Sequence, residues 1–176
     1  MREAPAFRDM TPEFTTVPAR DVLTVDGVGA PDDPAFTAAI RALYRVRAVL
    51  GAGTDVPLEG SYAQDGDQSR FDLDAPSGWH WRLLVPAPPD TTAEAVAAAA
   101  ARVGAAVALR SPAAQPVAQV MHQGPYADEG PSLAALHTFV KDEGRTPVGP
   151  HTEVYLADPA TVPPHALRTL LRVPVR

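Results

Sequence analysis

One short segment, residues 151–156 (HTEVYL), places a carboxylate between two side chains that form hydrogen bonds. Side chains alternate between the two faces of a β-strand. His151, Glu153 and Tyr155 are therefore expected to share one face, and the three residues that alternate with them are apolar enough to form core on the other. A glutamate in mid-strand is costly to bury unless it is paired or used. For this segment alone, a solvated glutamate on a half-exposed strand is the simpler interpretation.

Aromatic side chains gather in the expected strands and turns near this segment. Trp79 and Trp81 are two residues apart and share one face of a strand, and Tyr62 ends another expected strand. Tyr126 lies in a Gly-Pro-Tyr turn just before a helix. Each ring alone is most simply explained by core packing, but together with a mid-strand carboxylate the rings resemble a box for planar or cationic ligands. The sequence therefore predicts an aromatic pocket for small molecules centred on Glu153.

Other kinds of site have little support in the sequence. The five histidines show no spacing typical of metal ligands on one element, so we expect no metal and no cofactor. The Gly27-x-Gly29 pair lacks the third glycine of a dinucleotide-binding loop. No motif indicates a Ser-His-Asp nucleophile. These absences favour Glu153 as the centre of any chemistry.

Turn and helix signals predict the elements that hold these residues. Asp33 is placed to cap a helix that begins at Pro34, and Gly51 and Gly53 end it. An alanine-rich helix, with Thr92 as its cap, connects two halves of the chain. The expected elements are a flexible arm (1–13), strand 14–28, helix 34–50, strands 57–63 and 79–85 around a polar loop (64–78), the connecting helix (91–104), strand 116–123, helix 131–143, and strands 152–157 and 169–175.

The order of elements is the same in both halves, which favours a duplicated strand–helix–strand–strand unit. Gly27 and Pro34 are separated by the same interval as Gly124 and Pro131. Glu59 and Tyr62 fall near the equivalents of Glu153 and Tyr155, and this adds Glu59 to the candidate ligand-binding residues. The predicted architecture is one α+β domain over 14–176, with repeat one at 14–90 and repeat two at 105–176.

Two such units would join their sheets edge to edge into one antiparallel sheet. Helices would cover one face, and a pseudo-twofold crease would separate the halves. We expect the ligand on the opposite face or in that crease.

Composition narrows the class of protein. The chain has 176 residues, a net charge of −6, a pI near 5.3 and no cysteine. Acidity disfavours binding to nucleic acid phosphates, and no apolar run approaches the roughly 18 residues of a membrane span. The sequence thus favours a cytoplasmic protein, a monomer or homodimer, whose partner is a hydrophobic or cationic small molecule rather than nucleic acid or membrane.

Several motifs resemble one bacterial family. The order of Leu58-Glu-Gly60, Trp79-His-Trp81, Gly124-Pro-Tyr126 and Glu153-Val-Tyr-Leu-Ala-Asp-Pro159 is similar to that of the GyrI-like small-molecule-binding family. The resemblance extends from about residue 14 to the end. It implies the duplicated fold and a likeness to the effector domains of multidrug-sensing regulators.

The resemblance also implies a function for Glu153. Stand-alone members of the family include hydrolases that open the cyclopropane of duocarmycin-type genotoxins, which gives drug resistance. In them the matching glutamate activates water while an aromatic hydroxyl assists, here Tyr126. Tyr155, Tyr62, Trp79, Trp81, Glu59 and His151 would bind the ligand. Two positions depart from the family pattern, because Ser61 replaces an aromatic residue and Thr152 replaces a histidine.

Alternatives to an enzyme remain open from the sequence. The chain could be a non-catalytic sensor or sequestering module for hydrophobic cations. A protein that protects DNA gyrase by contact, suggested by the family name alone, is a further alternative. The sequence does not decide whether the chain is an enzyme.

Overall fold

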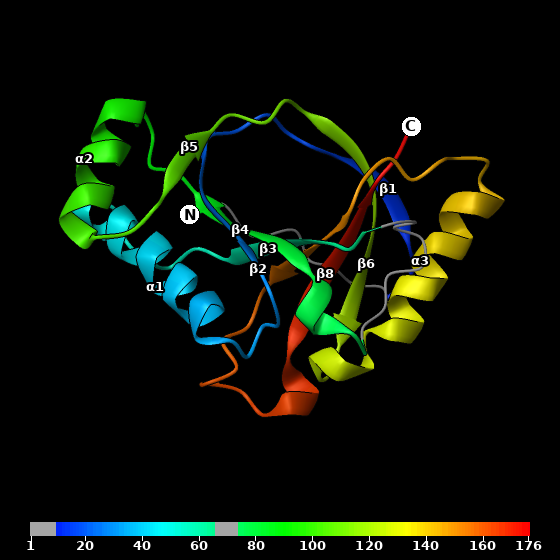
Figure 1. Ribbon diagram of the computed structural model, residues 1–176. Coiled ribbons are helices and arrows are strands. Elements are labelled where there is room, and N and C mark those ends of the chain that lie inside the picture. The colour runs from blue at the N-terminus through cyan, green and yellow to red at the C-terminus, as the bar shows by residue number, and fades with distance from the viewer. Residues whose placement is uncertain (1–9, 66–73) are drawn as a thin grey trace.

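The computed structural model describes residues 10–65 and 74–176, which form one open antiparallel sheet of eight strands and three α-helices (Figure 1). The predicted α+β class is confirmed. The strands are β1 (Glu13–Val17), β2 (Val22–Val28), β3 (Leu58–Ala63), β4 (His80–Pro86), β5 (Ala108–Arg110), β6 (Gln115–Gln123), β7 (His151–Tyr155) and β8 (Arg168–Pro174). The helices are α1 (Pro34–Val49), α2 (Ala93–Val103) and α3 (Gly130–Asp142). In this described part of the chain, no helix is both long and apolar enough to cross a bilayer.

The strand order is β1-β6-β8-β7-β3-β4-β2-β5. Read outward from the central β3–β7 pair, β3-β4-β2-β5 on one side corresponds to β7-β8-β6-β1 on the other. Each half contributes a strand–helix–strand–strand unit, β2-α1-β3-β4 and β6-α3-β7-β8. This arrangement is pseudo-twofold, with its centre between β3 and β7. A common origin of the two halves stays a prediction.

Some local predictions were wrong. The single strand predicted over 14–28 is two strands on opposite sides of the sheet, separated at Pro18–Asp21, and the short edge strand β5 was not predicted. The Asp33 carboxylate makes no capping bond to α1 and accepts the backbone N–H of Ala30 at 2.9 Å instead. Thr92 does cap α2, through the N–H of Ala95. Residues 1–9 of the predicted arm and 66–73 of the predicted loop lie outside the described residues.

Each half has its own apolar core beneath its helices. In the first half, α1 packs on β2 and β4, and α2 packs beside α1 and against β5. The buried side chains of this core include Leu23, Leu43 and Leu83. In the second half, α3 packs on β6 and β8 around Leu136 and Leu171. Figure 1 shows α1 and α3 at the two sides of the molecule, with the central strands between them.

The β3–β7 pair therefore lies between α1 and α3, and the helix-covered face of this pair is called the crease below. Its register places Gly60 opposite Glu153 and Tyr62 opposite His151, so these side chains share the helix-covered face. From the sequence, Thr152, Val154 and Leu156, which alternate with His151, Glu153 and Tyr155, are instead expected to form core. Val154 is indeed buried, in a small cluster on the helix-free face, but Leu156 is 44% exposed.

Candidate functional site

Glu153 lies in the middle of β7, in the crease, with only 6% of its surface exposed. Strand β7 has a neighbour on each side, β3 and β8, which fixes the direction of its side chains. The Nε2 atom of His151 is 3.1 Å from Oε1 of Glu153, and the Tyr155 hydroxyl donates to Oε2 at 2.7 Å. The three residues predicted to share a face thus form one hydrogen-bonded group around the carboxylate.

Tyr62 joins this group from the other half of the chain. Its hydroxyl lies 2.5 Å from that of Tyr155, and its ring folds over Gly60, where an added Cβ would be 2.5 Å from the same hydroxyl. Burial, and next the charge on Glu153, raises the pKa of both tyrosines well above the ordinary value. Both hydroxyls therefore stay protonated at neutral pH and remain hydrogen-bond donors.

A second carboxyl group, that of Glu129, is not among the residues predicted from the sequence. Glu129 directly precedes α3, is 2% exposed, and interacts electrostatically with Glu153. Burial, and next the charge on Glu153, raises the pKa of Glu129 to about 9, against the opposing effect of the Thr169 hydroxyl. Glu129 is therefore neutral at pH 7. Glu153 itself has His151 and Tyr155 as hydrogen-bond partners.

An acid at the start of a helix is usually explained by the helix dipole or by capping. Glu129 occupies that position, yet its side chain makes no capping hydrogen bond and is buried instead. In the sequence, the Gly-Pro-Tyr turn that ends three residues before Glu129 indicates that this loop differs from an ordinary connection. Only the packing of α3 against the sheet reveals that Glu129 meets Glu153.

Aromatic rings surround the carboxyl pair. The Tyr62 ring stacks on His151 with centroids 5.7 Å apart and meets Trp79 edge-on at 5.5 Å. Tyr126 meets Tyr155 edge-on at 5.5 Å. Tyr126 is 37% exposed, so it lies at the border between the buried group and solvent. The structure thus brings together six of the eight predicted site residues.

The other two predicted residues lie elsewhere. Trp81 neighbours Tyr62 across the β3–β4 pair, but its ring packs edge-on against Phe36 at 5.1 Å, in the core of the first half. Glu59 points to the helix-free face, where it pairs with Arg20 at 2.6 Å. Glu59 and Glu153, predicted to be near equivalents, therefore lie on opposite faces of the sheet, and Gly60 is the residue opposite Glu153. A one-residue difference reverses the face of a strand side chain.

Chemically, the group offers the buried carboxyl group of Glu153, a neutral carboxylic acid in Glu129, and protonated tyrosines. Such a set can attract a cation or move a proton to or from a bound molecule. Within residues 10–65 and 74–176, no three His, Cys, Asp or Glu side chains converge in a way that would hold a metal ion.

Comparisons with known proteins agree with this fold. Residues 90–176 match the GyrI-like small molecule binding domain. An uncharacterized conserved protein from Listeria innocua is 30% identical, with a TM-score of 0.82 over 95% of this chain and 93% of that one. A hydrolase encoded by lin2189 from Listeria innocua is 27% identical, with a TM-score of 0.82 over 97% and 94% of the two chains. No curated protein sequence matches.

A more distant structure, SAV2435 bound to tetraphenylphosphonium, shares the fold at 13% identity, with a TM-score of 0.51 over 95% of this chain and 94% of that one. The eight-stranded fold and these likenesses define a small-molecule-binding domain. The chain belongs to the GyrI-like family.

Proposed function

We propose that the crease around Glu153 binds hydrophobic, planar or cationic small molecules, and that it adds water to strained cyclopropanoid compounds of the duocarmycin type. The observation that carries this proposal is the buried carboxyl group of Glu153, which is bound by His151 and Tyr155 among aromatic rings. A single negative charge out of water attracts a delocalised cation more strongly than an exposed one does.

The rings provide the remaining part of the binding. Tyr62, Trp79 and Tyr126 present faces and edges around the carboxylate, and such surfaces stack on flat ligands and attract cations. Tyr126 is exposed enough to contact a ligand that enters from solvent. The expected ligand is therefore flat, largely apolar, and neutral or positive.

The proposed reaction begins with water that is positioned by Glu153. The water oxygen bonds to the cyclopropane CH₂ carbon while the ring C–C bond breaks, and that electron pair makes the dienone aromatic and places negative charge on its oxygen. Glu153 accepts the proton of the water and later returns it to solvent. The Tyr126 hydroxyl donates a hydrogen bond to the oxygen that becomes charged, and solvent protonates this oxygen. The sum is the addition of one water molecule.

The likeness to the lin2189 hydrolase supports a reaction that uses water. Ring strain already makes the cyclopropane carbon electrophilic. General-base assistance of about 10² to 10⁴-fold would then be enough to protect a cell.

Glu153→Gln tests both parts of the proposal. Binding of tetraphenylphosphonium, followed by quenching of tryptophan fluorescence, should weaken at least tenfold, because the variant has lost the charge that attracts the cation. Opening of a spirocyclopropyl dienone, followed by absorbance, should slow by about 10² to 10⁴-fold. Glu143→Gln, at the exposed end of α3, changes the net charge equally and should alter neither.

Unchanged turnover in a folded Glu153→Gln protein would refute the catalytic role. One observation favours a sequestering module instead, because both carboxylate oxygens of Glu153 already have partners, His151 and Tyr155. If the chain is a sequestering module, mass spectrometry should find the dienone intact after incubation. Tetraphenylphosphonium should still bind to the wild type, and Glu153→Gln should still weaken that binding.

A further inference from the structure

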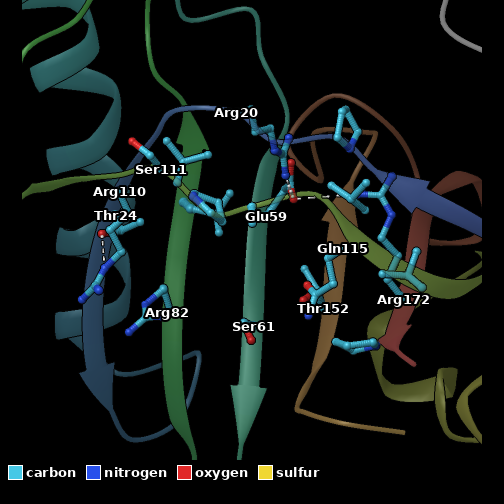
Figure 2. Close-up of a pocket in the computed structure, with 18 residues that line it drawn as sticks. Arg20, Thr24, Glu59, Ser61, Arg82, Arg110, Ser111, Gln115, Thr152 and Arg172 are labelled. Carbon is cyan, nitrogen blue, oxygen red and sulfur yellow. Dashed lines mark hydrogen bonds and ion pairs between the residues drawn. The ribbon is translucent and has the colours of Figure 1, made fainter. Parts of the chain in front are cut away.

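A cavity of about 540 Å³ lies on the helix-free face of the sheet, behind the crease. Its floor is formed by side chains of β2, β3, β4 and β7 that point away from the helices, among them Ser61 and Thr152. Two connections rise beside it, Pro18–Asp21 between β1 and β2 and Ser111–Ala114 between β5 and β6. They approach each other where the N–H of Arg20 donates to the Pro112 carbonyl. Figure 2 shows the polar side chains of this cavity.

Arginines dominate the charge of this cavity. In one cluster, Arg82 and Arg110 share the carboxylate of Asp26, with Arg82 bound to both of its oxygens at 2.6 and 3.1 Å. In the other, Arg20 lies 2.6 Å and Arg172 3.9 Å from the same oxygen of Glu59. Each cluster therefore has two guanidinium groups for one carboxylate and keeps one positive charge.

This excess of positive charge distinguishes the cavity from the rest of the molecule. The whole chain has a net charge of −6, whereas the charged residues that line the cavity are four arginines and one glutamate, so this local excess of positive charge is not explained by composition. One-to-one pairs of arginine and carboxylate would have solubilised an exposed sheet without leaving such a charge. Arg172 is mostly buried, and burial lowers the pKa of its guanidinium group. The carboxylate of Glu59 therefore compensates only partly for the hydration that Arg172 has lost.

We propose that this cavity binds a small organic anion whose carboxylate or phosphate groups are held between the two arginine clusters. Guanidinium groups match the planar or tetrahedral oxygens of these anions with pairs of hydrogen bonds. The volume is within the range of small-molecule sites.

The shape of the cavity favours a small molecule over a polyanion. Apolar side chains such as Val22, Leu84 and Pro112 line it between the charged clusters and would contact the hydrocarbon part of a ligand. A nucleic acid backbone instead needs an open groove of positive charge. The ligand of this face is thus opposite in charge to the cation expected in the crease.

Titration calorimetry at constant ionic strength tests this site with two probes, pyrophosphate for phosphate groups and citrate for carboxylate groups. Saturable binding of at least one is expected, and the stronger probe identifies the preferred group. Arg82→Gln and Arg20→Gln should each weaken binding about tenfold or more, because each removes charge-assisted hydrogen bonds. Arg45→Gln on the exposed side of α1 is the matched control and should change affinity less than twofold.

Ser61→Leu, which fills the floor without changing the charge, should also reduce binding at least tenfold. Circular dichroism confirms that each variant is folded. The proposal would be overturned if neither probe bound, or if Arg45→Gln lost as much affinity as the variants of the cavity. Tighter binding of heparin or duplex DNA than of both small anions would assign the face to a polyanion instead. Glu153→Gln should leave anion binding unchanged, so this result is independent of the function proposed for the crease.

Discussion

Glu129 and Glu153 meet in a site where water cannot screen them. Burial, and next the charge on Glu153, makes ionisation of Glu129 costly, so Glu129 keeps its proton over the physiological pH range. The proton resides on Glu129, whose position is the more buried of the two. The consequence is a stability that depends on pH in a direction opposite to that of an ordinary surface carboxylate.

The pH dependence can be measured with Glu129→Gln. The folded protein holds a proton on Glu129 between its ordinary pKa of 4.5 and about 9, whereas the unfolded chain releases it. The free energy of unfolding should therefore fall as pH rises through this window, by at most about 1.4 kcal/mol per pH unit. Glutamine mimics the neutral acid, so the variant should lose this slope.

Urea denaturation of both proteins between pH 5 and 9 provides the comparison. The variant should gain stability over the wild type as pH rises. A constant difference across the window would mean that Glu129 is charged in the folded state.

Alternation alone correctly placed His151, Glu153 and Tyr155 on one face, because the period of a strand is a local property. Glu129 and the pairing of Glu59 with Arg20 could not be found in this way. Both depend on contacts between segments far apart in the sequence. The motif residues near a site are thus more predictable than the partners that set their charge.

Among the elements, β3 shows how one missing side chain shapes the crease. Gly60 leaves space in which the Tyr62 ring lies over the strand and reaches Tyr155. Any Cβ at this position would be within 2.7 Å of three atoms of that ring and hydroxyl. Tyr62 would then have to leave its place beside the carboxyl pair.

Gly60→Ala should destabilise the protein by about 1–3 kcal/mol, as overpacking usually does. It should also weaken tetraphenylphosphonium binding, since the displaced Tyr62 no longer stacks on His151. Gly53→Ala is the control, because an added Cβ there meets nothing within 4 Å. Thermal unfolding and fluorescence titration of both variants check this. If the two variants unfold at the same temperature and bind tetraphenylphosphonium equally, the fit of Tyr62 over Gly60 contributes to neither stability nor binding.

The helices and inner strands were predictable because their signals are local: proline at the first turn, glycine after the last, and period-two alternation. The separation of β1 from β2 was harder to predict from the sequence. Phe14 and Val22 both alternate well, but Pro18 and Asp21 let the chain cross from one edge of the second half to the first. Where a strand pairs is decided by the whole sheet.

At the scale of the molecule, the two halves meet along the β3–β7 pair and through the Tyr62–Tyr155 contact. This continuous sheet predicts a single unfolding transition, although each half has its own core. Trp79 and Trp81 both belong to the core of the first half, so tryptophan fluorescence reports on that half and on its contact with β7. Far-UV circular dichroism reports on both. Their urea midpoints should coincide, whereas separated midpoints would show that the halves unfold independently.

The general architecture, an antiparallel sheet with helices on one face and a crease between halves, could be inferred from the repeated order of elements. The arginine cavity could not. Arg20, Arg82, Arg110 and Arg172 come from four distant segments and converge only after the strand order is known.

The alternation of β3 and β7 has a consequence for how this chain can change. Neighbouring residues of each strand serve opposite sides: Gly60 and Glu153 the crease, Ser61 and Thr152 the arginine cavity. Single substitutions alter one side and leave the other intact. An inserted or deleted residue within β7 would exchange the two sets, moving a carboxylate among arginines and a threonine among tyrosines. Residues of these strands can therefore be replaced one side at a time. The strands cannot be lengthened or shortened without exchanging the two sets of side chains.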